Sequence, residues 1–230
     1  MARKTKEEAQ ATREGILDAA LECFHEHGVA GTSLAAIGQR AGYSRGAVYW
    51  HFKNKTEVLE AMINRERTPF IKRLRRAYSA HRSTPIEDLR SAMLVSLDEL
   101  AGDPCLLRMM EIMLRNDLSA ESVAMQRLQN DYVTEEMGIF ERALERAQEL
   151  QQLRPGVDIR QLARILHATL TGIMTAAMLL KPPMFDLTGD SREALDALLS
   201  HYVNPGVFIP GAQPQPLPAT DADADADEVE

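Results

Sequence analysis

The stretch from Gly31 to Lys55 constrains the fold of this chain more than any other part of its sequence. Thr32 and Ser33 are of types that cap the start of a helix, because their hydroxyls can accept a hydrogen bond from the first turn. Leu34 and Ile37 follow at the i, i+3 spacing of one apolar helix face. This pattern predicts a short helix over residues 34–41.

A second short helix follows after a turn. Gly42 suits the positive φ that ends a helix, and Ser44 can cap a helix over residues 45–51. Two short helices joined by a glycine-containing turn form the helix-turn-helix pattern of DNA-binding proteins. The pattern therefore predicts double-stranded DNA as a partner.

The second helix of this pattern carries groups that suit DNA. Arg45 can hydrogen-bond to a guanine edge, so we assign base reading to it. Tyr49 and His51 can reach phosphate, and Gly46 lets the backbone approach the duplex closely.

These residues resemble the DNA-binding domain of TetR-type transcriptional regulators, most closely the AcrR- and TtgR-like branch that represses multidrug efflux pumps. The resemblance is strong over residues 1–65. In one departure, Tyr43 stands where the family usually has a small β-branched residue, and it either widens the DNA contact or packs the turn differently. The matching segments are residues 2–9, 32–34, 41–42 and 45–55.

The candidate DNA-contacting set extends over both helices and the turn. We expect Thr32 and Ser33 to meet phosphate through backbone N–H groups and hydroxyls, and Lys55 to meet phosphate through its ammonium group. The full set is Thr32, Ser33, Tyr43, Ser44, Arg45, Gly46, Tyr49, Trp50, His51 and Lys55.

The charge of the chain is unevenly distributed. The net charge is −8, which by itself argues against DNA binding. Residues 1–55, however, carry eight Lys and Arg against six Asp and Glu, a balance of +2, and the remainder carries 18 against 28. A basic-leaning head on an acidic body is expected when only one end meets phosphate.

The rest of the chain reads as helices, without strand-like alternation of any length. We therefore expect an all-α fold of about nine helices, with a TetR-like helix-turn-helix head and a larger helical body. Pro69 predicts a kink or break near Thr68. The expected domains are a DNA-binding head at 1–55, a ligand-binding and dimerisation body at 56–204, and a disordered tail at 205–230 rich in Pro, Gly and Asp.

The body is rich in methionine, a flexible and polarizable residue that suits surfaces binding several ligands, although methionine also fills irregular cores. The resemblance implies a pocket for a small hydrophobic inducer, but the family's pocket residues do not match this chain position by position. Glu135 and Glu136 adjoin the apolar stripes, and one of them can edge the cavity. The candidate lining residues are Met93, Leu97, Met110, Met113, Leu114, Met137, Phe140, Thr171 and Met174.

The helix expected after Asp158 is apolar almost all round. Ala168, Gly172 and Ala176 recur at four-residue steps, and such small residues let another helix approach closely. A helix that is apolar on all sides must be covered on all sides. The partner is either the body of the same chain or a second subunit, and the resemblance implies a homodimer formed through the last two helices.

Other functional classes find little support. No glycine-rich phosphate loop, H-E-x-x-H motif or nucleophile elbow occurs, so we expect neither an enzyme nor a cofactor. Cys23 and His27 share a helix face, but two ligands make a poor metal site. No segment suits a signal peptide or a membrane span, which points to the cytoplasm. The alternatives to an efflux repressor are a TetR-type regulator of metabolism and a ligand-free architectural DNA-binding protein.

Overall fold

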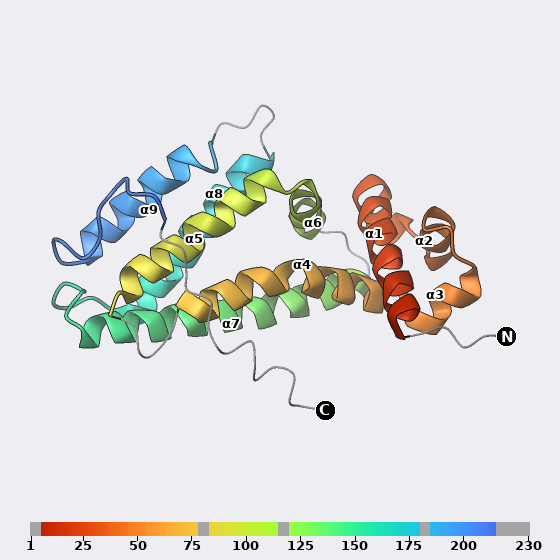
Figure 1. Ribbon diagram of the computed structural model, residues 1–230, viewed down its shortest axis with the longest axis horizontal. Coiled ribbons are helices and arrows are strands. Elements are labelled where there is room, and N and C mark those ends of the chain that lie inside the picture. Colours follow the sequence, from red (N-terminus) through yellow and green to blue (C-terminus); the bar gives the residue numbers. More distant parts are fainter. Residues whose placement is uncertain (1–5, 78–82, 115–119, 180–184, 215–230) are drawn as a thin grey trace. The chain divides into compact units, whose positions relative to one another are not determined.

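The computed structural model describes residues 6–77, 83–114, 120–179 and 185–214. Within these ranges the chain is helical, and its only β-type pairing is an isolated antiparallel bridge between Leu153 and Val203. The expected all-α fold class is therefore confirmed. In chain order the helices in Figure 1 are α1 (Lys6–Gly31), α2 (Leu34–Arg40), α3 (Arg45–His51), α4 (Lys55–Ala77), α5 (Pro85–Gly102), α6 (Pro104–Leu114), α7 (Ala120–Glu149), α8 (Ile159–Leu179) and α9 (Gly189–Tyr202).

The helices group into two compact units. Unit 1 consists of residues 1–69 and 103–132, and unit 2 of residues 70–102 and 133–230. Both α4 and α7 contribute residues to each unit. The expected domain boundary at residue 55 stays a prediction.

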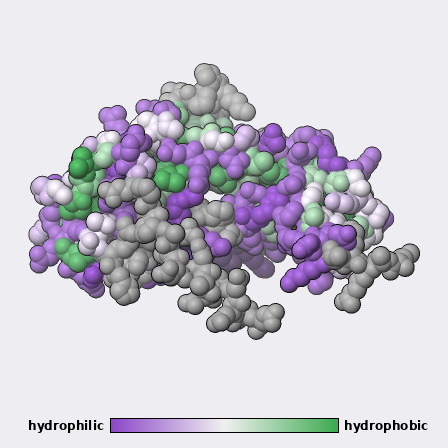
Figure 2. All heavy atoms as spheres, viewed as in Figure 1, coloured by the Kyte–Doolittle hydropathy of each residue, from purple (hydrophilic) through white to green (hydrophobic). Residues whose placement is uncertain are grey.

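Unit 1 is built around the apolar side of α1. Ile16 and Leu17, and Phe24 about two helical turns further on, are fully buried. Met109 and Met113 of α6 belong to the same hydrophobic core. The helix-turn-helix and α6 therefore share one core, while hydrophilic residues cover much of the face seen in Figure 2.

The helix α4 runs without a break through Pro69, so the break expected near Thr68 is absent, and the alternative of a kink stays a prediction. Proline removes one backbone hydrogen bond from a helix. Apolar side chains on both sides of the proline are buried, among them Ile63 before it and Leu74 after it. Burial of both halves of the helix offsets the lost hydrogen bond.

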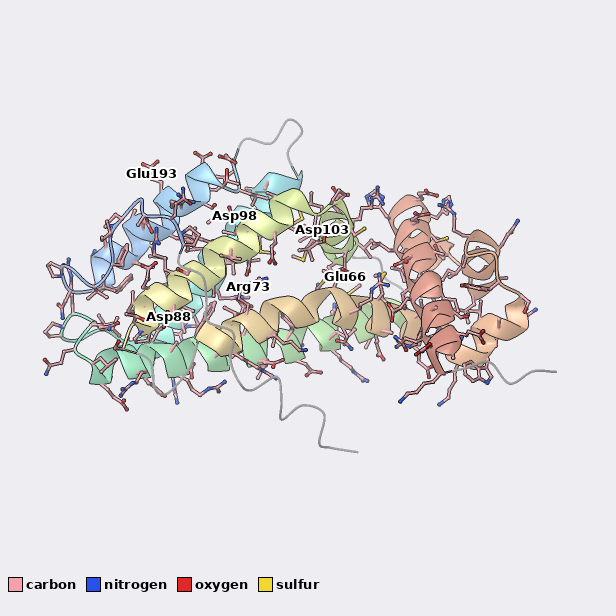
Figure 3. The ribbon with its side chains drawn as sticks, in the orientation of Figure 1. Glu66, Arg73, Asp88, Asp98, Asp103 and Glu193 are labelled. Carbon is pink, nitrogen blue, oxygen red and sulfur yellow. The ribbon has the colours of Figure 1, made fainter. Side chains whose placement is uncertain are left out.

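Charged pairs join neighbouring helices within unit 2. Arg73 of α4, which is labelled in Figure 3, donates a 2.9 Å hydrogen bond to the Ser96 hydroxyl and pairs with Glu99 of α5. Arg75 pairs with Glu135 of α7. The pair of Arg75, whose side chain is exposed, is of a kind that contributes at most about 1 kcal/mol. Across the described ranges, no helix combines the length and the apolar character needed to cross a bilayer.

A buried arginine ties α5 to α9. The Arg90 side chain is fully buried, with Nε 2.5 Å from Asp196 Oδ1 and Nη1 3.1 Å from Glu87 Oε1. Burial disfavours its charge, but the hydrogen bond with Asp196 and the charges of Glu87 and Asp196 outweigh this and raise the pKa of Arg90. Breaking such a network leaves an unpaired buried charge, at a cost of about 3–5 kcal/mol.

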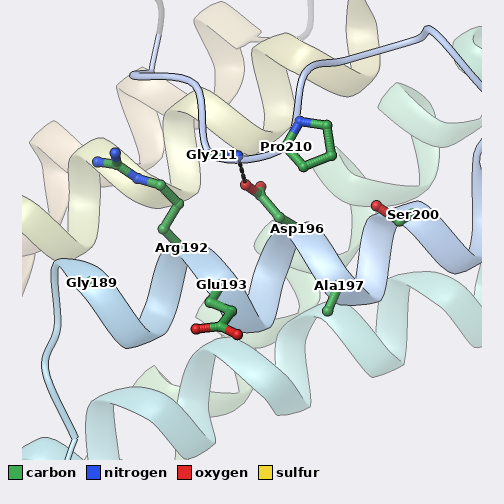
Figure 4. Close-up of a pocket in the computed structure, with 8 residues that line it drawn as sticks. All are labelled: Gly189, Arg192, Glu193, Asp196, Ala197, Ser200, Pro210 and Gly211. Atoms are coloured by element: carbon green, nitrogen blue, oxygen red, sulfur yellow. Dashed lines mark hydrogen bonds between the residues drawn. The ribbon is translucent and has the colours of Figure 1, made fainter.

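The segment after α9 packs back onto this arginine. Nη2 of Arg90 donates to the Ala212 carbonyl at 2.8 Å, and the Phe208 ring lies under its guanidinium. The Gly211 N–H donates to Asp196 at 2.7 Å, beside an open groove of about 440 Å³ (Figure 4). We expected disorder from residue 205, but residues 205–214 are held by partners far away in sequence. Residues 215–230 of the expected tail lie outside the described residues.

Candidate nucleic-acid interface

Two capped helices and a glycine turn form the expected helix-turn-helix. The Ser33 hydroxyl oxygen accepts a 3.1 Å hydrogen bond from Ala36 N–H, and that of Ser44 accepts a 3.2 Å bond from Ala47 N–H. Gly42 has a φ of 72°, which favours glycine. The caps and the turn begin and end both helices where the sequence predicts, to within one residue.

Close packing of α2 against α3 depends on Gly38. A Cβ atom at Gly38 would lie 2.9 Å from Cγ2 of Val48 and 3.3 Å from the carbonyl oxygen of Tyr43. Val48 is fully buried and has a stiff β-branched side chain, so it cannot yield easily. Gly38 thereby helps to set the position of α3.

The predicted contact residues of α3 lie on its exposed face. Trp50 is 72% exposed and Tyr49 is 46% exposed, and Arg45 and Gly46 are exposed as well. The Arg45 guanidinium lies 5.3 Å from the centre of the Tyr49 ring, where a cation–π contact can hold it. The helix carries no acidic residue. This face is therefore suited to phosphate and to base edges.

The remaining cationic candidates lie at the ends of helices. His51 is half-buried at the end of α3, and its ring meets Trp50 edge-on with centroids 4.5 Å apart. Lys55 begins α4, and its Nζ donates to the Ala30 carbonyl at 3.4 Å. These contacts position both side chains, and their phosphate contacts stay predictions.

Thr32 does not fit its expected role. It is 4% exposed, and its hydroxyl contacts the carbonyl oxygens of Gly28 at 2.8 Å and Cys23 at 3.1 Å. Its backbone N–H donates to Val29. Both groups expected to meet phosphate are thus used inside unit 1, and we remove Thr32 from the proposed contact set. N-cap and buried threonines look alike in sequence.

Tyr43 packs against α1. A Cβ atom at Gly15 would lie 3.2 Å from the Tyr43 hydroxyl and 3.3 Å from its ring, so glycine makes room for the tyrosine. Tyr43 is half-buried and adjoins the core of unit 1. Of the two readings left open by the sequence, this contact favours packing of the turn.

Arg40 is a cation of α2 that the sequence did not single out. Its guanidinium donates to Glu22 at 2.9 Å and to Glu26 at 3.1 Å. The hydrogen bond to Glu26 has the largest effect, followed by the one to Glu22, and both raise the pKa of Arg40. The bond from Arg40 in turn lowers the pKa of Glu26. Arg40 thus ties α2 to α1. The i, i+4 spacing of the two glutamates is the signal that could have revealed this contact.

The candidate ligand residues are divided between the units. Met110, Met113 and Leu114 belong to unit 1. Thr171 is exposed on α8 beside the exposed Gly172, unlike the buried members of the set. None of the nine lines the groove beside α9. The members in unit 2 are Met93, Leu97, Met137, Phe140, Thr171 and Met174.

Comparisons with known proteins agree with this geometry. The bacterial regulatory proteins of the tetR family match residues 16–62, and the C-terminal region of MAATS-type transcriptional repressors matches residues 84–204. The chain belongs to the TetR family of transcriptional regulators. The two matches cover the helix-turn-helix and most of the helical body of this TetR-family regulator.

Individual relatives place it in the expected branch of the TetR family. It is 33% identical over 205 residues to the transcriptional regulator AcrR of Shigella flexneri, covering 88% of this chain and 94% of AcrR. The structure of SmeT, the repressor of the Stenotrophomonas maltophilia multidrug efflux pump SmeDEF, is 50% identical, with a TM-score of 0.82 over 91% of this chain and 99% of SmeT. The SmeT–triclosan complex is 52% identical, with a TM-score of 0.87, and the match covers 91% of this chain and 100% of SmeT in the complex. These relatives are transcriptional regulators.

Proposed function

We propose that this TetR-family regulator represses a multidrug efflux pump operon. It binds a near-palindromic operator as a homodimer, and a small lipophilic compound releases it. The proposal rests on the exposed face of α3, a helix without acidic residues. It also rests on the 50% sequence identity to SmeT, a repressor of such a pump. The SmeT–triclosan complex supports a ligand of this kind.

The DNA contacts divide by role. Arg45 reads a base edge, whereas Tyr49, His51 and Lys55 hold phosphate. Paired α3 helices of a dimer enter major grooves about one helical turn, roughly 35 Å, apart. The further contact residues are Ser33, Ser44, Gly46 and Trp50, whereas Tyr43 packs the turn against α1.

The second subunit docks on α8 and α9. Ala168 and Gly172 are exposed on α8, and a Cβ atom at Gly172 would meet nothing within 4 Å. Ala197 is exposed on α9. Small exposed residues on two adjacent helices allow a partner's helices to approach closely, which supports a four-helix dimer interface.

The proposed roles differ between successive segments of the chain. Residues 1–55 bind DNA, residues 56–204 bind the inducer and dimerise, and residues 205–230 form a tail. The apolar candidates of the body, such as Met93, Met137 and Phe140, line the inducer site. A repressor acts where the DNA is, which in a bacterium is the cytoplasm.

The test uses the full chain and the DNA upstream of its own gene and of neighbouring pump genes. Analytical ultracentrifugation with a labelled duplex should give one or two dimers per operator, and footprinting should show a near-palindromic site. A monomer at micromolar concentration would contradict the dimer. Equal affinity for unrelated duplexes would favour an architectural DNA-binding protein instead.

A further inference from the structure

Glu136 of α7 is a buried carboxylate, and one of its two oxygens lacks a hydrogen-bond partner in the part of the chain that the structure describes. The residue is 4% exposed, and its Oε2 lies 3.2 Å from Nδ1 of His167 on α8. Its Oε1 is buried and has no hydrogen-bond partner among the described residues. A buried acceptor without a donor is costly, so such an atom calls for a donor from elsewhere.

Among the described residues of unit 2, no other carboxylate has a buried oxygen without a hydrogen-bond partner. Both oxygens of Asp196 accept hydrogen bonds, from Arg90 and from Gly211. Glu135, the neighbour of Glu136 on α7, is half-buried and pairs with Arg75. Glu136 Oε1 is therefore set apart from the acids that hold the fold together.

Buried apolar residues lie next to Glu136 on α7 and next to its partner His167 on α8. Phe140, one turn further along α7, is fully buried, as is Leu166 of α8, and Leu170 is 3% exposed. A hydrogen bond formed in such surroundings is stronger than one formed in water. An isolated acceptor in an apolar region is the arrangement that orients a mostly apolar ligand by its single polar group.

We propose that Glu136 Oε1 anchors the polar end of the inducer, and that the inducer is a neutral, mostly apolar molecule with one hydroxyl or N–H donor. This rests on the proposed function, which supplies a ligand-binding body but does not name the ligand's chemistry. His167 holds the other oxygen and so fixes the orientation of the carboxylate.

The pairing with His167 selects a neutral ligand. The hydrogen bond with Glu136 raises the pKa of His167, which favours the imidazolium form beside the carboxyl group. A cationic ligand would add an uncompensated charge beside the imidazolium, and an anionic ligand would be repelled by the carboxylate. A neutral donor instead gains a hydrogen bond to a charged acceptor.

The experiment compares two probes that differ in one donor: triclosan, a phenol, and its methyl ether. Titration calorimetry on the full-length protein, at a pH where the phenol is neutral, should give about tenfold or more tighter binding of triclosan. The measured quantity is the ratio of the methyl ether Kd to the triclosan Kd. In Glu136→Met, which keeps the length of the side chain but removes the acceptor, this ratio should fall to about one. Glu135→Met is the matched control and should keep the wild-type ratio. Glu136→Gln, which retains a weaker acceptor, serves if the methionine variant does not fold, and its ratio should fall between the two.

The outcomes separate this proposal from the proposed function. If the methyl ether binds as tightly as triclosan and still releases operator DNA, the repressor mechanism stands and the anchor is refuted. A ratio that Glu136→Met leaves unchanged refutes it as well, and indicates that water occupies the site. A lipophilic quaternary ammonium ion that loses affinity in Glu136→Met, while triclosan does not, overturns the neutral ligand class. If neither probe binds and no pump substrate releases the operator, both proposals fail.

Discussion

Replacing Gly38 with alanine should separate α2 from α3 and so impair DNA binding. Alanine in a helix is favoured over glycine by about 0.5–1 kcal/mol. The added Cβ, however, would lie 2.9 Å from Cγ2 of the buried Val48, and overpacking of this kind costs about 1–3 kcal/mol. We expect a net loss of about 0.5–2 kcal/mol in the free energy of unfolding.

The functional effect of Gly38→Ala should exceed its effect on stability. A displaced α3 loses base-edge hydrogen bonds, so operator affinity should fall about tenfold or more. Urea unfolding and fluorescence anisotropy with a labelled operator measure the two effects. Gly102→Ala is the control, because a Cβ there meets nothing within 4 Å.

A second substitution tests the cause. Val48→Ala removes the methyl groups that Gly38→Ala would strike, and by itself it costs about 2 kcal/mol through the cavity that it leaves. If the clash is the cause, the double variant should lose at least about 1 kcal/mol less than the two single variants together. Wild-type stability and affinity in Gly38→Ala would refute the reasoning.

Gly15→Ala should destabilise unit 1 by about 1 kcal/mol in wild type but stabilise it in a Tyr43→Val background, as urea unfolding would reveal by a change of sign. Arg45→Ala should cost about 1–3 kcal/mol in operator binding and relax one position of each half-site, whereas an unchanged profile in a randomised-site selection would exclude base reading. Because the bond with Glu136 raises the pKa of His167 above 6.5, its stabilisation is fully present below pH 6.5 and is lost as the pH rises through the raised value. The excess stability of wild type over His167→Gln should therefore shrink over that range, and a pH-independent difference would contradict the pairing.

The head could be predicted from sequence because its signals are local. Caps such as Ser33 and Ser44 act within one turn, and Gly42 sets its own backbone angle. The sequence could not show that Thr32 is buried, because its hydroxyl bonds to Cys23, nine residues away. Nor could it show the fit of Tyr43 against α1, which depends on the angle between helices.

The body was harder to predict because its decisive contacts are distant in sequence. Arg90 and Asp196 are 106 residues apart, and neither has a local pattern that marks it as buried. The same network orders residues 205–214, whose composition alone indicates disorder. Glu136 adjoins an apolar stripe in sequence, but only the fold shows that one of its oxygens lacks a donor.

The most direct test of the account is the coupling between inducer and operator in the full-length protein. Anisotropy gives the operator Kd with and without saturating triclosan, and calorimetry gives the triclosan Kd with and without operator. The account predicts that each ligand weakens the other by the same factor, about 5- to 150-fold. An operator Kd that triclosan leaves unchanged, although the compound binds, would contradict a repressor released by its ligand.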